Sequence, residues 1–388
     1  MPPITHPTRP LPSYPILNIL YRILYTGTIL ARVPWWILRY TFFRQHSTWT
    51  FRQAFMMNLF TELVYVDSRV EKHQPLSLDP GKEKDCWTRI PPFPEDMYKG
   101  PLQSEVVKPA TIGGTWFPCK PAATGDMTGI VIMHIHGGGF VLGDGRKDNV
   151  GFLAQQYLDH CGEKIKIEAV FSPQYRLSSR PTCAPFPAAL QDVLTSYLYL
   201  VQTLSIPPDK IVLAGDSAGG NLAIGLLRYF SEFGSGSGQN KIPLPRCSVL
   251  VAPWTSPVKH LWPEVAMKSN PNFGTDYLGI EFCRWGAGAY VVGHNKPLDD
   301  PYITPLGHAF STPVPIFVAL GALEILAIDG KEWVDEMRRE DRGNVLELFV
   351  EDGAPHDTLL VGWVVGFEES ARRVVRRVGK FIEMYSTS

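Results

Sequence analysis

The sequence predicts an α/β protein with a mostly parallel central sheet that is covered by helices on both faces. Within residues 104–388, short runs rich in Ile, Val, Leu and Ala alternate with segments of helical composition. This alternation is typical of a parallel sheet, whose strands are joined by helices that pack on its two faces. One strand-like run is joined to the next helix by the glycine-rich turn Gly215–Gly220. The chain has 388 residues, of which 45% are hydrophobic, so it can form one large α/β domain and a smaller unit.

The first hydrophobic segment, residues 16–43, is interrupted by Arg22, Arg32 and Arg39. It contains no uncharged span of the ~18 residues that a clean membrane helix needs, and it lacks the layout of a cleaved signal peptide. In a helix the three arginines would lie within an arc of roughly 100°, opposite an aromatic side, and Pro34 would kink that helix. Two compatible interpretations follow. The segment contacts a membrane surface peripherally, folds down over an active site, or does both.

The remaining N-terminal sequence predicts three further parts. Residues 1–15 are Pro-rich, so we expect a mobile tail. A second helix with an aromatic stripe is expected at about 50–72. Residues 74–101 are rich in Pro, Gly and charge, so we expect a linker or surface loop. Residues 16–103 would therefore form a helical cap with a linker.

From residue 104 onward the elements follow one another in a regular order. Strands are expected at 105–110, 111–119, 130–135, 167–173, 211–215, 247–252, 315–321 and 345–350. Helices are expected at 146–161, 187–204, 217–233 and 359–385, and a flexible Gly/Ser loop at 234–240. Residues 254–305 break the alternation with helical, aromatic and turn-rich sequence, so we expect an insertion above the sheet.

The turn around Ser217 matches Gly-x-Ser-x-Gly in a strand–turn–helix context. A turn this tight forces the serine into a strained backbone conformation, and Gly215 and Gly219 leave room for neighbouring backbone. The hydroxyl is then held clear of the sheet at the N-terminus of the following helix. Ser217 is therefore the predicted nucleophile, although a plain glycine-rich turn would show the same pattern.

A serine nucleophile needs a general base, and the base needs a carboxylate that fixes its tautomer. His356 is the predicted base because it comes directly after the last predicted strand. With this type of turn the order along the chain is serine, acid, histidine, so the acid should follow the strand at 315–321. Glu324 lies at the exit of that strand and is the predicted acid. Asp329 is the alternative, on a predicted helix that points away.

The glycine triplet that follows the strand at 130–135 is the candidate oxyanion hole. It offers backbone N–H groups without side chains in the way, and the loss of one such donor costs ~3 kcal/mol of transition-state stabilisation. We assign the role to Gly138 and Gly139, together with the N–H of Ala218 behind the nucleophile. Gly137 is a further candidate.

Other kinds of site are poorly supported by the sequence. The chain lacks the GxGxxG and Lys-Ser/Thr patterns of phosphate-binding loops. His134 and His136 share one face of a strand, but no third ligand accompanies them, so we expect neither a metal nor a cofactor. The six cysteines contain no CxxC pair, and the net charge of −1 argues against a nucleic-acid partner.

Four blocks of sequence resemble the hormone-sensitive-lipase family of α/β-hydrolases. They are His136–Gly139, Tyr175–Leu177 with Pro185–Leu190, Gly215–Gly220 and Gly353–His356, and the resemblance covers about residues 104–388. It implies an α/β-hydrolase fold with a cap built from the N-terminal segment and from the insertion at 254–305. It also implies a serine carboxylesterase. The family usually has Asp at the acid position, whereas this chain has Glu324, whose extra methylene changes its reach.

The long apolar N-terminus is similar to that of fungal members of the family, among them steryl acetyl hydrolases and esterases or lactonases of polyketide pathways. It also resembles the N-terminus of membrane-anchored arylacetamide deacetylases. The sequence contains no Asn-x-Ser/Thr acceptor, which disfavours a glycosylated secreted protein. We therefore expect an intracellular protein, either cytoplasmic or associated with the surface of a membrane such as the endoplasmic reticulum.

The leading hypothesis is hydrolysis of a bulky lipophilic ester through an acyl-enzyme. An acetyl ester, a lactone, or a sterol or polyketide ester would suit an aromatic cap formed by Trp35, Trp36, Phe42, Phe43, Trp254, Trp262, Phe282 and Trp285. The alternative is an acyltransferase or cyclase, because water exclusion decides which acceptor takes the acyl group. A non-catalytic ligand receptor is disfavoured because His356 is present. The sequence specifies neither the natural substrate nor the oligomeric state.

Overall fold

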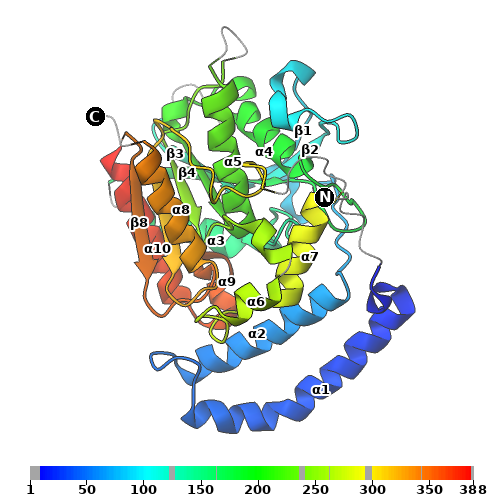
Figure 1. Cartoon of the computed structure of the whole chain (residues 1–388). Helices are drawn as coiled ribbons and strands as arrows, with labels where there is room; N and C mark the ends of the chain where they lie inside the picture. The colour runs from blue at the N-terminus through cyan, green and yellow to red at the C-terminus, as the bar shows by residue number, and fades with distance from the viewer. Residues whose placement is uncertain are drawn as a thin grey trace.

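The computed structural model describes residues 9–121, 127–162, 164–235, 241–261, 263–292, 299–341 and 343–385. Its strands form one sheet with the order β1-β2-β4-β3-β5-β6-β7-β8 (Figure 1). The strands are β1 (Trp87–Ile90), β2 (Ile112–Phe117), β3 (Ile130–Ile135), β4 (Ile167–Gln174), β5 (Ile211–Asp216), β6 (Cys247–Val251), β7 (Ile316–Gly321) and β8 (Leu346–Glu351). Strands β3 to β8 pair in parallel, whereas β1 and β2 are antiparallel to their neighbours. The prediction of a mostly parallel sheet is confirmed.

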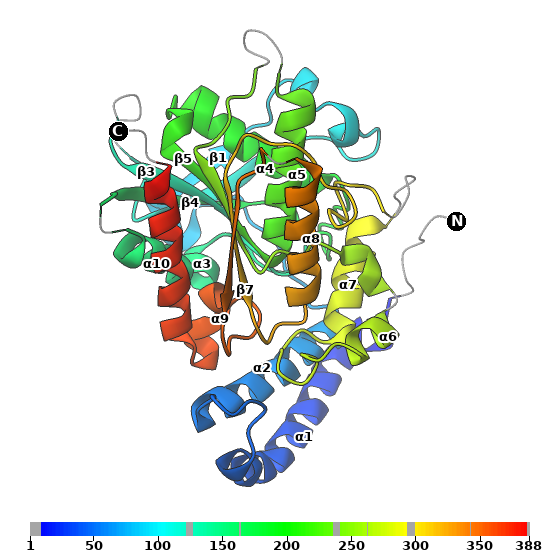
Figure 2. The ribbon, with the colours of Figure 1, turned by 60° about the vertical axis from the view of Figure 1, so that its left-hand side comes forward.

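Helices cover both faces of this sheet (Figure 2). One face carries α3 (Lys147–His160), α9 (Thr358–Val365) and α10 (Glu368–Met384), and the other carries α4 (Ala188–Leu198), α5 (Ser217–Phe233) and α8 (Ala327–Glu340). Alternate residues of a strand point to opposite faces. In β3, for example, Val131 and Met133 belong to the core under α4 and α5, and Ile130 and Ile132 belong to the core under α3 and α10. Burial on both faces explains why the central strands are continuously apolar.

The opening strands differ from the prediction. Residues 105–110 form no strand, and the partner of β2 is β1, which lies inside the segment predicted as a linker. This strand is only four residues long and lies at the sheet edge, so it leaves no hydrophobic run in the sequence. The packing explains one local feature: a Cβ atom at Gly113 would lie 1.9 Å from the Trp87 ring, so only glycine fits against that ring.

The C-terminal helix also differs, because residues 359–385 form two helices rather than one. Gly366 ends α9 with φ +82° and its N–H bonds to the carbonyl of Gly362, after which α10 begins. A left-handed residue at this position closes a helix and turns the chain. The predicted helix 187–204 likewise ends as an α-helix at Leu198 and continues as one π-helical turn.

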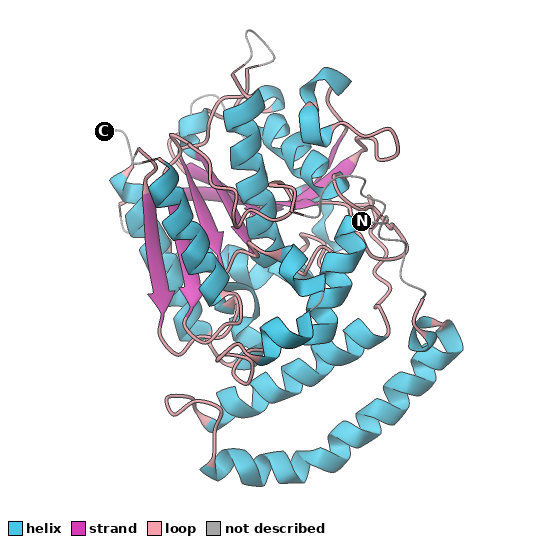
Figure 3. Cartoon of the chain, in the orientation of Figure 1, coloured by secondary structure: helices cyan, strands magenta, loops and turns pink. Residues whose placement is uncertain are grey.

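The insertion between β6 and β7 contains the short helix η8 (Pro257–Leu261), α6 (Pro263–Lys268) and α7 (Ile280–Val291). It lies at the edge toward which the strands point, next to α2 (Phe51–Arg69) (Figure 3). The predicted flexible loop at 234–240 and mobile tail at 1–15 lie largely outside the described residues. The described part of the tail, from Arg9 onward, forms a 3₁₀ turn at Leu11–Ser13.

Helix α1 (Pro15–Phe42) is the outermost element and packs along α2 (Figure 1). It continues through Pro34 as a curved helix. Two of its arginines face α2: Arg22 pairs with Asp67 at 2.9 Å, and Arg32 pairs with Glu62 at 2.7 Å. The basic side predicted for this helix therefore lies largely against the protein, and the apolar side faces outward.

Candidate active site

Ser217 lies at the turn between β5 and α5, with φ +50°. A non-glycine residue in this conformation is strained, and such strain is typical of a nucleophile at this kind of turn. The flanking glycines are required by packing. A Cβ atom at Gly215 would lie 2.4 Å from the carbonyl oxygen of Gly219, and one at Gly219 would lie 2.0 Å from that of Ile135.

His356 follows β8, and its Nδ1 lies 3.0 Å from Oε2 of Glu324. Glu324 follows β7, as the sequence predicts, and both side chains are buried. A proton on Nδ1 that is donated to the carboxylate leaves Nε2 free to accept one. The alternative acid, Asp329, lies on α8 and instead binds Lys259 at 2.9 Å and the Ser256 hydroxyl.

Ser217 and His356 line the same cavity, which has a volume of about 240 Å³. Among the described residues no hydrogen bond joins the two side chains directly; such bonds are often long in ligand-free enzymes and tighten when substrate binds. The walls are mostly apolar and come from five parts of the chain: the glycine loop, α2, the start of α3, the insertion and α9. The apolar and aromatic wall residues are Phe60, Val64, Leu142, Tyr277, Leu278, Phe282, Leu360, Val361, Trp363 and Val364.

The aromatic residues predicted to form a cap are mostly not in this cavity. Within the described part of the chain only Phe282 lines it. Trp36 and Trp254 are buried in packing, Trp35, Phe42 and Phe43 are exposed, Trp285 packs edge-on against Phe282, and Trp262 lies outside the described residues. The wall residues on α2 and α9 were not singled out from the sequence as pocket residues, because their spacing is equally typical of core packing.

The glycine loop at residues 137–139 runs beside the nucleophile. Gly138 lines the cavity with φ +101°, and Gly139, with φ +62°, lies under the Phe282 ring. Ala218 is buried in the first turn of α5. Helix N-terminal N–H groups have no intrahelical partner, so the Ala218 N–H is free to bind a substrate oxygen.

Tyr175 supports this loop from behind. Its hydroxyl donates to the carbonyl oxygens of His136 at 2.9 Å and Gly137 at 3.2 Å, and its ring stacks on His136 at 4.2 Å. These contacts fix the backbone of the glycine loop at His136 and Gly137. The sequence marked Tyr175 only as part of a family block and gave it no role.

A second carboxyl pair lies behind the site. Asp216 and Asp357 are both buried, and each carboxyl shifts the pKa of the other. Asp216 immediately precedes Ser217 and Asp357 immediately follows His356, so the pair connects the nucleophile turn to the base loop. Burial raises the pKa of Asp357 well above its usual range and that of Asp216 to about 6. Burial thus favours the protonated form of Asp357.

Burial and nearby charges shift the pKa of His356 in opposite directions. Burial lowers the pKa of His356, while the nearby carboxyls of Asp276 and Asp357 act to raise it. Burial also raises the pKa of Glu324. The resting site thus holds a neutral imidazole, which is the protonation state that a general base requires.

His134 and His136 serve the fold around the site. His134 Nε2 lies 2.7 Å from Asp216, and His136 Nδ1 lies 2.8 Å from the carbonyl oxygen of Gly137. Burial lowers the pKa of each to about 4, so both rings are neutral. No group of three or more metal-ligating side chains occurs within the described residues.

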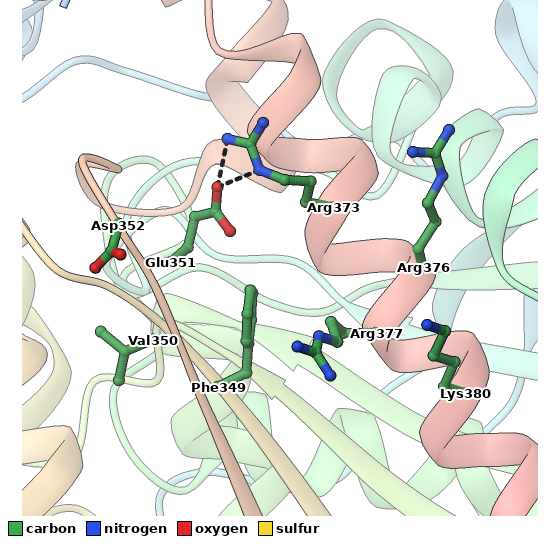
Figure 4. A pocket seen from close by; sticks show the side chains of 8 residues that line it. All are labelled: Phe349, Val350, Glu351, Asp352, Arg373, Arg376, Arg377 and Lys380. Carbon is green, nitrogen blue, oxygen red and sulfur yellow. Dashed lines mark hydrogen bonds and ion pairs between the residues drawn. The ribbon is translucent and has the colours of Figure 1, made fainter. Parts of the chain in front are cut away.

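A larger hollow of about 450 Å³ lies between β8 and α10, away from Ser217 (Figure 4). Arg373, Arg376, Arg377 and Lys380 line it, and Arg373 binds Glu351 in a salt bridge. Its lining has four basic and two acidic side chains but no nucleophile. The smaller cavity beside Ser217 is the one with groups suited to covalent catalysis.

Comparison with known proteins agrees with this geometry. A family model described as "alpha/beta hydrolase fold" matches residues 132–360. An acetyl-hydrolase from Streptomyces hygroscopicus is 28% identical over 203 residues, which cover 52% of this chain and 60% of that protein. An ethyl acetate hydrolase from Pseudomonas putida is 24% identical over 244 residues (62% and 69%). Hormone-sensitive lipase from Mus musculus is 36% identical over 97 residues (24% and 12%).

Solved structures show the same fold. An esterase from the bacterial hormone-sensitive lipase family superposes with a TM-score of 0.57 at 22% identity, covering 92% of this chain and 97% of the esterase. An esterase from Pyrobaculum calidifontis superposes with a TM-score of 0.59 at 18% identity, covering 84% and 92%.

Proposed function

Because the chain belongs to the α/β hydrolase fold family, and within it to the hormone-sensitive-lipase type, we propose that it is a serine carboxylesterase for lipophilic esters. The observation that carries this proposal is the arrangement of three side chains. Ser217 and His356 share one cavity, and Glu324 binds His356 on the side away from it.

The proposed reaction proceeds in two halves. Ser217 Oγ attacks the ester carbonyl while His356 Nε2 takes its proton, and Glu324 stabilises the imidazolium that forms. The oxyanion is bound by the N–H groups of Gly138, Gly139 and Ala218, and the alcohol leaves with the proton from His356. Water activated by His356 then hydrolyses the acyl-enzyme. The alternative acceptor is a second alcohol or amine, which would make the protein an acyltransferase.

The cavity supports a small acyl group on a larger apolar alcohol. At about 240 Å³ it is smaller than a typical pocket for a drug-sized ligand. Apolar side chains of α2 and α9, such as Phe60 and Trp363, form its walls, and Trp363 is 51% exposed. An acetyl or other short acyl chain fits beside Ser217, while a bulky apolar alcohol would extend along this outer wall.

Turnover of p-nitrophenyl esters from acetyl to dodecanoyl, by wild type and Ser217→Ala, tests the proposal. We expect wild-type turnover that is highest for short chains and disappears in the variant, together with loss of fluorophosphonate labelling. Labelling that persists in Ser217→Ala would reject Ser217 as nucleophile. Labelling of wild type without turnover, followed by product formation when an alcohol is added, would favour acyl transfer.

We also propose that α1 contacts a membrane surface. It is the one helix among the described residues that is long and apolar enough to cross a membrane, but Arg22 and Arg32 are held by acids on α2, which favours a helix lying on the surface. Its outward side exposes a continuous set of large apolar residues: Ile16, Ile19, Leu20, Ile23, Leu24, Leu30, Trp35, Leu38 and Phe42. Such a patch on a soluble surface marks an interaction site.

Vesicle flotation tests this contact. The double variant Ile19→Glu/Ile23→Glu should lose binding to phosphatidylcholine vesicles while it keeps turnover of p-nitrophenyl acetate. Val106→Glu, at a 91% exposed apolar position away from α1, is the matched control and should bind as wild type does. Equal flotation of both variants would contradict the proposal.

A further inference from the structure

One segment of the insertion contacts both the loop that carries the predicted acid and the ring of the predicted base. Residues 270–278, here called the strap, connect α6 to α7 and lie against residues 322–325, here called the acid loop, which carries Glu324. The strap is distant from the acid loop in sequence. Its side chains nevertheless bind that loop by hydrogen bonds along its whole length.

All four carbonyl oxygens of the acid loop accept a hydrogen bond from a strap side chain. Asn272 Nδ2 donates to two of them, and Asn270 Nδ2 and Thr275 Oγ1 donate to one each. The pairs are Asn272 to Ala322 at 3.0 Å, Asn272 to Glu324 at 2.9 Å, Thr275 to Leu323 at 3.0 Å and Asn270 to Ile325 at 2.9 Å. Buried carbonyls without partners are costly, so the loop conformation depends on these donors.

Asp276 completes this contact from the acceptor side. Its carboxylate accepts from the N–H of Ile325 at 2.6 Å and from the N–H of Leu278 at 3.3 Å. The side chain is only 6% exposed, and its charge acts on His356 in the direction that raises the pKa of the imidazole. Asp276 therefore binds the acid loop through a hydrogen bond, and its charge acts on the pKa of His356.

The next residue of the strap reaches the base and the cavity. The Tyr277 ring lies 5.6 Å from the His356 ring, and on its other side it packs edge-on against Phe60 of α2 at 4.8 Å. Tyr277 also lines the cavity. The strap thus joins the cavity wall, the base and the acid loop in one continuous set of contacts.

Given the proposed function, we infer that the strap is a positioning element for Glu324, so that the insertion assembles the catalytic acid as well as covering the substrate. The reason is the flexibility of the glutamate side chain. Glutamate has one more rotatable bond than aspartate, so its carboxylate reaches His356 in one place only if the backbone that carries it is fixed. A misplacement of about 1 Å at a catalytic group can cost roughly 10²-fold in rate.

The decisive variant is Asn272→Asp, which keeps the shape of the side chain and removes both donors. We expect kcat for p-nitrophenyl acetate to fall by about 10²-fold, with KM changed by no more than a few-fold. The matched control is Asn344→Asp. The amide of Asn344 likewise bridges two carbonyls, those of Phe310 and Met337, away from the site, although Asn344 is buried and Asn272 is half-buried. This control should lose thermal stability and keep its kcat.

Two further variants separate positioning from a general loss of folding. Thr275→Val removes a single hydrogen bond and should lower kcat in a protein that still folds. Asp276→Asn should also move the acid limb of kcat/KM to lower pH, because a negative charge near His356 is lost. The other groups that face His356 are Glu324, Asp357 and Tyr277, and all three stay in place.

The outcomes are distinguishable from failure of the proposed function. If wild type neither turns over esters nor is labelled at Ser217, the proposed function is wrong. If wild type is active while Asn272→Asp and Thr275→Val keep its kcat, the strap does not position Glu324. Equal losses of kcat in Asn272→Asp and Asn344→Asp would likewise overturn the inference.

Discussion

The buried pair of Asp216 and Asp357 leads to a specific prediction for the stability of the variant Asp357→Asn. We predict that Asp357 shares a proton with Asp216 in the folded protein, because burial beside that carboxyl raises its pKa. Its side chain also accepts from the N–H of Leu360 at 3.2 Å, at the N-terminus of α9. Asparagine can donate to Asp216 and accept from the N–H of Leu360 at every pH, because its amide group does not titrate. It also tolerates the left-handed conformation of this residue, whose φ is +47°.

The size of the expected change in stability follows from the proton that Asp357 holds in the folded state. Because burial raises the pKa of Asp357 well above its value in the unfolded chain, the folded state holds a proton that the unfolded state releases above about pH 4. The free energy of unfolding of wild type therefore falls with pH, by at most about 1.4 kcal/mol per pH unit for this group. Asparagine has no such proton. The stability of Asp357→Asn relative to wild type should thus rise between pH 5 and pH 7 at up to that slope.

Alanine should show the same pH trend as asparagine but from a lower starting stability. Asp357→Ala removes a donor to the buried carboxylate of Asp216, which is worth about 1.5–3 kcal/mol, and a helix N-cap, which is worth about 1 kcal/mol. At pH 5 this variant should be less stable than wild type by about 2.5–4 kcal/mol. Urea unfolding followed by tryptophan fluorescence from pH 5 to pH 8 measures both variants, with the exposed neighbour Asp352→Asn as the control. A pH-independent difference between Asp357→Asn and wild type would refute the shared proton.

Three other predictions concern the reaction. Glu324→Gln should lower kcat/KM by about 10³- to 10⁴-fold through loss of tautomer control, whereas Asp329→Asn should stay near wild type in the same assay; the reverse order would make Asp329 the acid. The acid limb of kcat/KM should lie below the ordinary histidine value of 6.5, because burial lowers the pKa of His356 and only the neutral imidazole accepts a proton; a limb above 6.5 in a pH–rate profile would contradict this. Phe60→Ala should enlarge the cavity along the alcohol wall and raise kcat/KM for the acetyl ester of a bulkier alcohol, such as naphthyl acetate, relative to p-nitrophenyl acetate; an unchanged ratio would show that Phe60 does not contact the alcohol.

Much of the fold could be predicted because its central strands are buried on both faces. β3, β5, β6 and β7 each show a continuous apolar run, and each was predicted to within one or two residues. The errors lie where that signal is weak. β1 is four residues long at a sheet edge, and the break between α9 and α10 depends on the backbone angle of Gly366, which composition does not reveal.

The residues of the candidate site likewise fall into those that the sequence could predict and those that it could not. Ser217, His356 and Glu324 could be placed because each follows a recognisable strand, and the carboxyl ends of parallel strands meet at one sheet edge. Asp357 and the strap could not be placed. Their partners lie far away in sequence, and an Asp next to a His or a run of Asn, Thr and Asp is typical of any surface loop.

The orientation of α1 shows what the structure adds to a periodic pattern. The sequence predicts a helix with a basic side and an apolar side but not which side faces the protein. Because Glu62 and Asp67 of α2 neutralise the inner arginines, the apolar side faces outward. The same helix α2 lines the cavity with Phe60 and Val64. If α1 lies on a membrane, α1 and α2 lie between the lipid and the cavity, so an ester dissolved in the bilayer has a short apolar path to Ser217.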